Sequence, residues 1–80
     1  MQVRVTREHV HDVRLPDEEV LIVADRRVEA DQIAADLGLM AWEWAFAKPR
    51  WLDNGPVYKN RLVVARDWIP LGPHVELVLV

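Results

Sequence analysis

Two histidines near the start of the chain have a spacing that suits metal ligands. His9 and His11 lie two residues apart in the stretch HVHD, and on a β-strand this spacing puts both side chains on one face, where they could chelate zinc. A zinc site needs a third ligand, which Asp12 or His74 could supply only if the fold brought it close. Because histidines on exposed strands are common without a metal, we predict no metal site.

Asp25 is the acid best placed for chemistry, because it follows the apolar run VLIVA of residues 20 to 24. An acid at the carboxyl end of a strand can hold a metal or a phosphoryl group, but no second carboxylate stands at a fixed spacing from Asp25. We therefore interpret it as the cap of the next helix. The turn ADRRVEA has no glycine that would let the backbone approach a pyrophosphate, so a dinucleotide cofactor is not expected.

Catalysis has little support in the sequence. The chain contains neither serine nor cysteine, the two usual nucleophiles. A small hydrolase or metal enzyme would need His9, His11 and Asp25 to converge in one pocket. We predict that the protein is not an enzyme and uses no cofactor.

The stretch from residue 48 to 61 mixes basic and aromatic side chains. Trp, Tyr and Arg are enriched at the hot spots of protein interfaces, and the same mixture can stack bases and hold phosphates. The rings could also simply cover a small core. We predict partner binding here, with Trp51 as an exposed anchor. The predicted partner-binding residues are Lys48, Arg50, Trp51, Tyr58, Lys59 and Arg61.

A helix-turn-helix over residues 30–49 is the main rival interpretation. Ile33, Ala34, Leu37 and Gly38 fit the first helix and tight turn of that motif. Downstream, MAWEWAFAKP offers only Glu43 and Lys48 as polar side chains before a proline, whereas a recognition helix must present polar groups to base edges. Nucleic-acid binding through this segment or through the 48–61 loop is the alternative function.

The elements that would position these residues follow from periodicity. The runs 20–24 and 61–65 are typical of buried strands, and residues 74–80 predict a last strand. An N-terminal strand begins at QVRVT and extends less regularly to Leu15. Between the first two runs, a helix is expected over about 26–38. Its apolar stripe is Ala30, Ile33, Ala34 and Leu37, and Gly38 is placed to end it.

Three of the four tryptophans lie in WEWAFAKPRW, residues 42 to 51. Trp42, Trp44 and Phe46 alternate with Glu43, Ala45 and Ala47, which predicts a strand with one aromatic face. We expect that face to belong to the core or to an interface.

Length and charge limit the remaining choices. A chain of 80 residues forms one domain, residues 1–80, which buries only roughly 60% of its unfolded surface and has no room for a large substrate cavity. Residues 1 to 40 carry nine acids against five Arg, which argues against a nucleic-acid binder over the whole surface. The lack of cysteine fits a cytoplasmic protein, and no secretory signal or membrane span is expected.

We predict a compact α/β domain that contains a βαβ unit, with one main helix packed on a four- or five-stranded mixed sheet. With one main helix, the second face of the sheet lacks a helical cover. Either a short turn near Pro49 to Asn54 and the loops cover that face, or a second copy or another partner does, and we predict a homodimer.

The order of VLIVA, EADQIAADLGL, the aromatic strand and RLVVARDW resembles small uncharacterised α/β proteins encoded by actinobacterial phages. The resemblance covers roughly residues 20 to 68, and QVRVTREHVHDVRLP lies outside it. It implies a host-cytoplasm setting and no known activity. The expected function is a non-enzymatic protein-binding module, a phage accessory protein that acts on a host or self partner.

Overall fold

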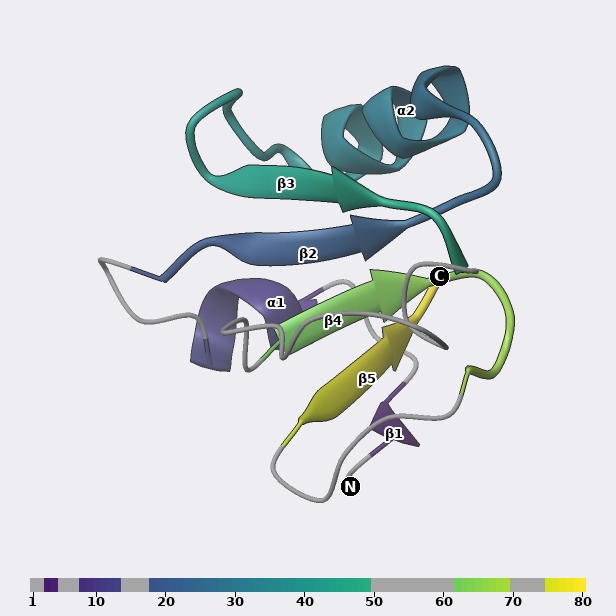
Figure 1. The fold of residues 1–80 in the computed structure, drawn as a ribbon. Coiled ribbons are helices and arrows are strands. Elements are labelled where there is room, and N and C mark those ends of the chain that lie inside the picture. The colour runs from purple at the N-terminus through teal and green to yellow at the C-terminus, as the bar shows by residue number, and fades with distance from the viewer. Residues whose placement is uncertain (1–2, 5–7, 14–17, 50–61, 70–74) are drawn as a thin grey trace.

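The computed structural model describes residues 3–4, 8–13, 18–49, 62–69 and 75–80, and the structural statements below concern those residues. They form one sheet and two helices (Figure 1). The elements in chain order are β1 (Val3–Arg4), α1 (Glu8–Val13), β2 (Val20–Val23), α2 (Arg27–Leu37), β3 (Trp44–Ala47), β4 (Leu62–Ala65) and β5 (Glu76–Leu79).

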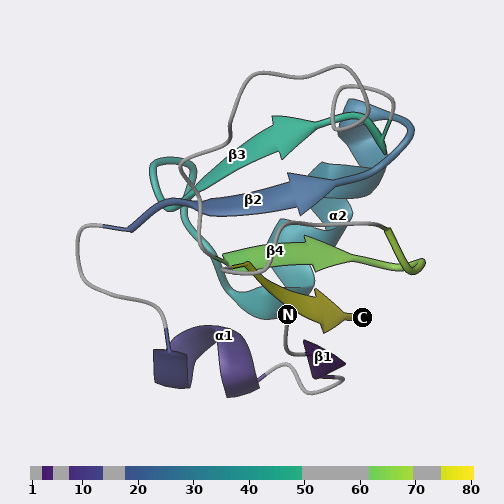
Figure 2. The ribbon, with the colours of Figure 1, turned by 60° about the horizontal axis from the view of Figure 1, so that its bottom comes forward.

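The five strands lie in the order β1-β5-β4-β2-β3, and every neighbouring pair is parallel. Figure 2 shows β2, β3, β4 and β5 running in the same direction with α2 behind them. The α/β class, the βαβ unit and the strand number of the sequence prediction are confirmed, whereas the expected mixed sheet is wrong. Helix α2 returns the chain to the starting edge of β2, so that β3 can only run parallel to it.

Strands β2 and β4 form the centre of the sheet, and all four residues of each are buried. Parallel strands that are covered on both faces have continuous apolar sequences, and VLIV and LVVA have that composition. Their register pairs Leu21 with Val63 and Val23 with Ala65. The two buried strands predicted from the sequence are therefore confirmed and prove to be direct neighbours.

Helix α2 buries Ala30, Ile33, Ala34 and Leu37, as the stripe predicted. Gly38 ends it at φ 72° and ψ 27°, the left-handed conformation that glycine adopts without a Cβ penalty. The Leu39 N–H then donates to the Ala34 carbonyl at 2.9 Å. The predicted end of the helix is confirmed.

The predicted cap at the start of α2 is wrong. Arg26, with φ −132° and ψ 148°, occupies the N-cap position, and its side chain makes no capping hydrogen bond. Asp25 lies one residue too early, because Arg26 is still extended and the helix begins at Arg27. Its carboxylate is left exposed instead of being used by the helix.

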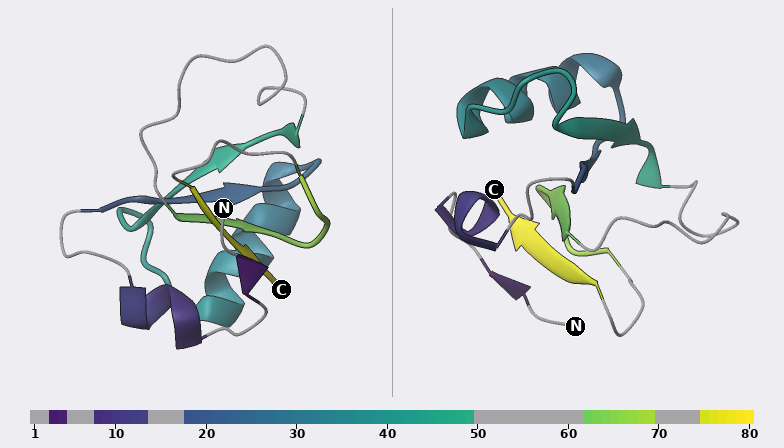
Figure 3. Two further views of the ribbon diagram at one scale, coloured as in Figure 1. Left: turned by 90° about the horizontal axis from the view of Figure 1, so that it is seen from below. Right: turned by 90° about the vertical axis from the view of Figure 1, so that its left-hand side faces the viewer.

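Both described helices lie on the same face of the sheet, so the helices and strands that the structure describes form two layers (Figure 3). Their buried side chains, including Val10 of α1 and Ile33 of α2, belong to one cluster with Ile22 and Val64 of the central strands. Burying a side chain of this size stabilises the fold by about 1.5–3 kcal/mol. This cluster is the main core.

The N-terminal segment differs from its prediction. Of its described residues, Val3–Arg4 is strand, paired with Leu77 and Val78 of β5, and Glu8–Val13 is a helix where an extended strand was expected. The alternation in HVHDV imitates a strand over only a few residues. In α1, Val10 is fully buried in the main core, and this tertiary contact outweighs the weak local pattern.

The face of the sheet opposite α1 and α2 is also buried. Leu21, Val63 and Leu77 are 3% exposed or less there, and they form a second cluster with Val23, Ala65 and Ile69. These values hold for a single chain. The described residues of this face are thus buried within one chain, as the alternative of cover by loops expects, and the homodimer stays a prediction.

The aromatic strand is shorter than predicted. Trp44 is buried and Phe46 half-buried, and both pack on the α2 side of the sheet. The Arg27 guanidinium lies 4.9 Å from the Trp44 ring centroid and 5.9 Å from that of Phe46. Trp42 lies in the turn before β3 and is 72% exposed, so it does not share their face. Two of the three aromatic residues thus belong to the core.

Candidate functional site

The chain leaves β2 and β4 in opposite directions along the sheet. After β2 it continues to β3, and after β4 it continues to β5 on the other side. In open parallel sheets, ligands bind in the crevice outside the carboxyl ends of the strands at such a switch point. We call this side of the sheet the carboxyl edge and define it by the residues that follow the strands, 24–29, 48–49, 66–69 and 80.

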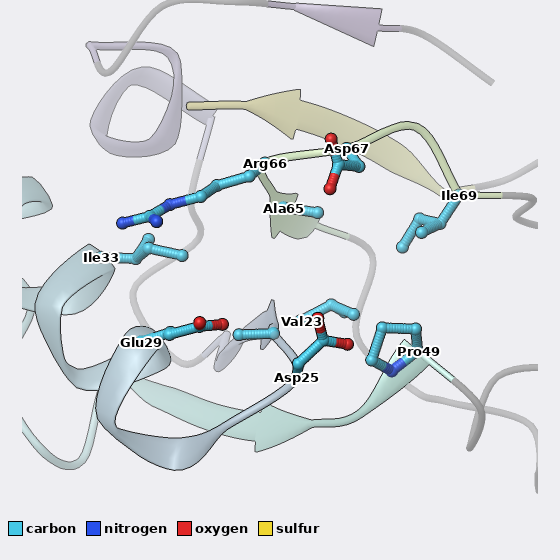
Figure 4. A pocket seen from close by; sticks show the side chains of 10 residues that line it. Val23, Asp25, Glu29, Ile33, Pro49, Ala65, Arg66, Asp67 and Ile69 are labelled. Carbon is cyan, nitrogen blue, oxygen red and sulfur yellow. The ribbon is translucent and has the colours of Figure 1, made fainter.

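A pocket of about 80 Å³ opens at the switch point (Figure 4). Its residues come from the end of β2, the first half of α2, the start of the segment after β3, and the end of β4. They are Val23, Ala24, Asp25, Glu29, Ile33, Pro49, Ala65, Arg66, Asp67 and Ile69. We call it the switch-point pocket.

The apolar wall of the switch-point pocket is part of the core. Val23 and Ala65, the last residues of β2 and β4, are paired in register and nearly fully buried. Ile33 and Ile69 belong to the clusters on the two faces of the sheet. The wall is therefore held by the packed framework, which makes the pocket a preformed feature of the fold.

Carboxylates dominate the charged groups of the pocket. Asp25 and Asp67 each stand two residues beyond the register pair Val23 and Ala65, so β2 and β4 deliver them to equivalent places. Glu29 adds a third carboxylate from the first turn of α2. Figure 4 shows these side chains turned toward the pocket from three elements.

Among the described residues that line the pocket, Arg66 is the one cationic side chain. In Figure 4 it extends toward α2 and Ile33, away from Asp67. Among the residues that the structure describes, neither Arg66 nor the three carboxylates forms a side-chain hydrogen bond or ion pair. Asp25, Arg66 and Asp67 are exposed and Glu29 is half-buried, so these charges are accessible to a ligand.

Sequence reasoning missed Asp67, Arg66 and Glu29. A signal for Asp67 existed, because VLIVAD and LVVARD both end in aspartate. The carboxyl ends of parallel strands meet at one edge, so two such endings predict two carboxylates in one place. The sequence shows no second carboxylate at a fixed spacing from Asp25, because that carboxylate, Asp67, follows the neighbouring strand β4.

Of the predicted partner-binding residues, the structure describes Lys48 alone. It is half-buried, directly follows β3 and lies on the carboxyl edge, and the next residue, Pro49, lines the switch-point pocket. The predicted loop therefore starts at this pocket. The other predicted residues, Arg50, Trp51, Tyr58, Lys59 and Arg61, lie outside the described residues.

The spacing argument for a zinc site at His9 and His11 does not apply to this fold. Residues 9 and 11 belong to helix α1, whereas the zinc spacing assumed a shared strand face. His74 lies outside the described residues. Within the part of the chain that the structure describes, no three His, Cys, Asp or Glu residues group as metal ligands.

The helix-turn-helix alternative does not match the fold. Residues 30–37 are helical as that motif requires, but Trp44–Ala47 is strand β3 in the place of the second helix. Every residue of β3 pairs with β2. Nucleic-acid binding through a recognition helix in residues 30–49 is thus excluded by the local structure.

Large apolar side chains are exposed at both edges of the sheet. The carboxyl edge carries Val28, Trp68 and Val80, and Trp68 is 58% exposed between the pocket residues Asp67 and Ile69. The amino edge, which we define as the turn of residues 38–43, carries Met40 and Trp42. Exposed aromatic side chains of this kind mark candidate interaction sites.

Comparison with family models, with curated proteins and with solved structures finds no match to this chain. Neither of the described helices has the length and apolar character needed to cross a membrane.

Proposed function

We propose that this protein is a non-enzymatic protein-binding module that docks its partner through the carboxyl edge of its sheet. The observation that carries the proposal is the switch-point pocket together with Trp68, which is exposed on the same edge between the pocket residues Asp67 and Ile69 in the sequence. Pockets and large exposed aromatic side chains are typical of interface hot spots. The predicted binding loop from Lys48 to Arg61 also starts at this edge.

The size of the pocket supports binding over catalysis. Pockets for drug-sized ligands and cofactors measure about 300–1,000 Å³, well above the 80 Å³ found here. A pocket of this volume can enclose the end of one protein side chain, whereas most of a nucleotide would lie outside it. We propose a cytoplasmic setting and a role as a phage accessory protein that acts on a host or self partner.

Nucleic-acid binding remains the alternative, through the basic and aromatic residues of the 48–61 loop. The described lining of the switch-point pocket speaks against phosphate binding in the pocket itself, because it carries three carboxylates and one guanidinium. The rest of the described carboxyl edge adds Arg26, Arg27 and Lys48. A surface that holds phosphates needs an excess of cations, and its affinity falls steeply as salt is added.

The test is a capture experiment from an actinobacterial lysate, with and without nuclease, followed by mass spectrometry. Wild type is compared with Trp68→Ala and Trp51→Ala. Trp42→Ala serves as the matched control, because it removes another exposed indole, from the amino edge. We expect Trp68→Ala and Trp51→Ala to lose a protein that wild type and Trp42→Ala retain, with all variants folded by circular dichroism.

Two results would reject the proposal. One is a protein partner lost with Trp42→Ala but kept with Trp68→Ala, which would place the interface at the amino edge. The other is the capture of nucleic acid that nuclease and added salt remove, which would favour the alternative function.

A further inference from the structure

We infer that the switch-point pocket receives a basic side chain, lysine or arginine, from the protein partner. This inference rests on the proposed function and specifies the chemistry of the partner. It follows from three properties of the pocket: its size, its charge and its division into apolar and charged walls.

The size limits the occupant to a small group. A cavity needs about 10–15 Å³ on this measure for one water molecule, so 80 Å³ holds several waters or the end of one side chain. The walls are backed by the packed ends of β2 and β4, where Val23 and Ala65 are 4% and 2% exposed. The pocket therefore has little room to expand for a larger ligand.

The charge determines the sign of the occupant. Asp25, Glu29 and Asp67 line the pocket, against the single guanidinium of Arg66, which extends toward α2. None of these groups forms a salt bridge or side-chain hydrogen bond with a described residue, so the carboxylates are available to a ligand. A cation in the pocket is attracted by the carboxylates that line it, while an anion is repelled.

The apolar and charged walls fit a basic side chain better than a bare ion. Ala24, Ile33 and Ile69 can contact an aliphatic stem, and the carboxylates at the rim can accept from the charged end. Trp68 is exposed between the pocket residues Asp67 and Ile69 in the sequence, and its indole is available to the residues that flank the inserted side chain. The acidic balance of the whole chain, a formal charge of −3, also favours a basic partner segment.

The test uses a capped pentapeptide with arginine at its centre and glycine or alanine elsewhere, titrated into the ¹⁵N-labelled full chain and followed by NMR. We expect saturable shifts of the Asp25, Glu29 and Asp67 amides and of the Trp68 indole. The same peptide with glutamine in place of arginine should bind roughly tenfold more weakly.

Charge variants locate the site. Asp67→Asn and Glu29→Gln should each weaken binding of the arginine peptide roughly three- to tenfold. Asp36→Asn is the matched control, because it changes the net charge equally at an exposed position of α2 that does not line the pocket. It should leave the affinity unchanged to within about twofold, a difference too small for a lost contact.

Several results would overturn the inference. One is equal affinity for the glutamine and arginine peptides. Another is the absence of chemical-shift changes of the pocket amides at about 10 mM arginine peptide. A third is tighter binding of Mg²⁺ or inorganic phosphate, followed by the shifts of the same amides. Self-association that displaces the peptide would assign the pocket to a second copy.

If Trp68→Ala loses the captured partner while Asp67→Asn and Glu29→Gln retain it, the proposed function stands and this inference fails. If all three retain it, both fail.

Discussion

The two edges of the sheet use their polar groups differently. At the amino edge, the Met40 N–H donates to Glu43 Oε1 and the Glu43 N–H donates to the Met40 carbonyl, both at 2.9 Å. At the carboxyl edge, Asp25, Arg66 and Asp67 are exposed and pair with none of the described side chains. The polar groups of the amino-edge turn thus form hydrogen bonds within that turn, whereas Asp25, Arg66 and Asp67 at the carboxyl edge are available to a ligand.

This difference teaches how a very small domain can combine stability with binding. Groups that contact a ligand are seldom the ones that stabilise the free protein, and binding sites are often destabilising. Substitutions at the amino edge should therefore reduce the free energy of unfolding and leave binding intact. Substitutions of the pocket charges should weaken binding and leave the free energy of unfolding nearly unchanged.

The largest effect is expected for Leu37→Ala, at the amino-edge end of α2. Leu37 is 4% exposed in the main core, and its truncation leaves a cavity there. The free energy of unfolding should fall by about 2–5 kcal/mol, measured by urea denaturation. The folded fraction should still bind the arginine peptide. A loss below about 1 kcal/mol would show that the end of α2, directly before the amino edge, does not support the fold in this way.

Gly38→Ala should have the next largest effect. A Cβ at this position meets nothing within 4 Å, so the cost comes from the positive φ of 72° alone. We expect a loss of about 1–2 kcal/mol in the free energy of unfolding. Gly38→Asn is the matched control and should cost less, because asparagine tolerates the left-handed conformation better. Equal stability of the alanine variant and wild type would contradict this account of the turn.

Arg27→Ala should have a smaller effect. It removes the stacking on Trp44 and Phe46 and the 3.4 Å ion pair with Asp31, whose members are 66% and 55% exposed. The expected loss is about 0.5–1 kcal/mol, since the site is open to solvent. Arg26→Ala is the matched control and should be nearly neutral, because the Arg26 side chain makes no capping bond. Equal thermal shifts for the two variants would argue against the stacking contribution.

The smallest effect on stability is expected at the carboxyl edge. Asp25→Asn and Asp67→Asn should change the free energy of unfolding by less than about 0.5 kcal/mol. Any change should be a gain that shrinks with added salt, because each substitution relieves like-charge repulsion. Denaturation at low and high ionic strength measures this. A loss above about 1 kcal/mol would mean that these carboxylates have a structural role, and would remove the contrast between the edges.

The central elements could be predicted because their sequences carry strong local patterns. Continuous apolar runs identify β2 and β4, and the stripe ending in Leu37 and Gly38 identifies α2. Helix α1 was missed because it has only six residues and depends on the burial of Val10 in the core. Trp42 was misplaced because alternation continues one step beyond the true start of β3.

The candidate site could be predicted only in part, because it depends on strand order. Asp25 and Asp67 come together since β4, and not only β3, lies next to β2. Nothing in the local pattern of either strand contains that information. The connection of the predicted binding loop to this site is visible at Lys48 and Pro49, where the loop begins.

The most direct test of the central claim, that the carboxyl edge docks the partner, is site-specific photocrosslinking in actinobacterial cells. A benzophenone amino acid replaces Trp68 in one variant and Trp42 in the other, two exposed positions at opposite edges. The account predicts a discrete protein adduct from position 68 that position 42 does not form. An adduct from position 42 that equals or exceeds the one from position 68 would contradict it.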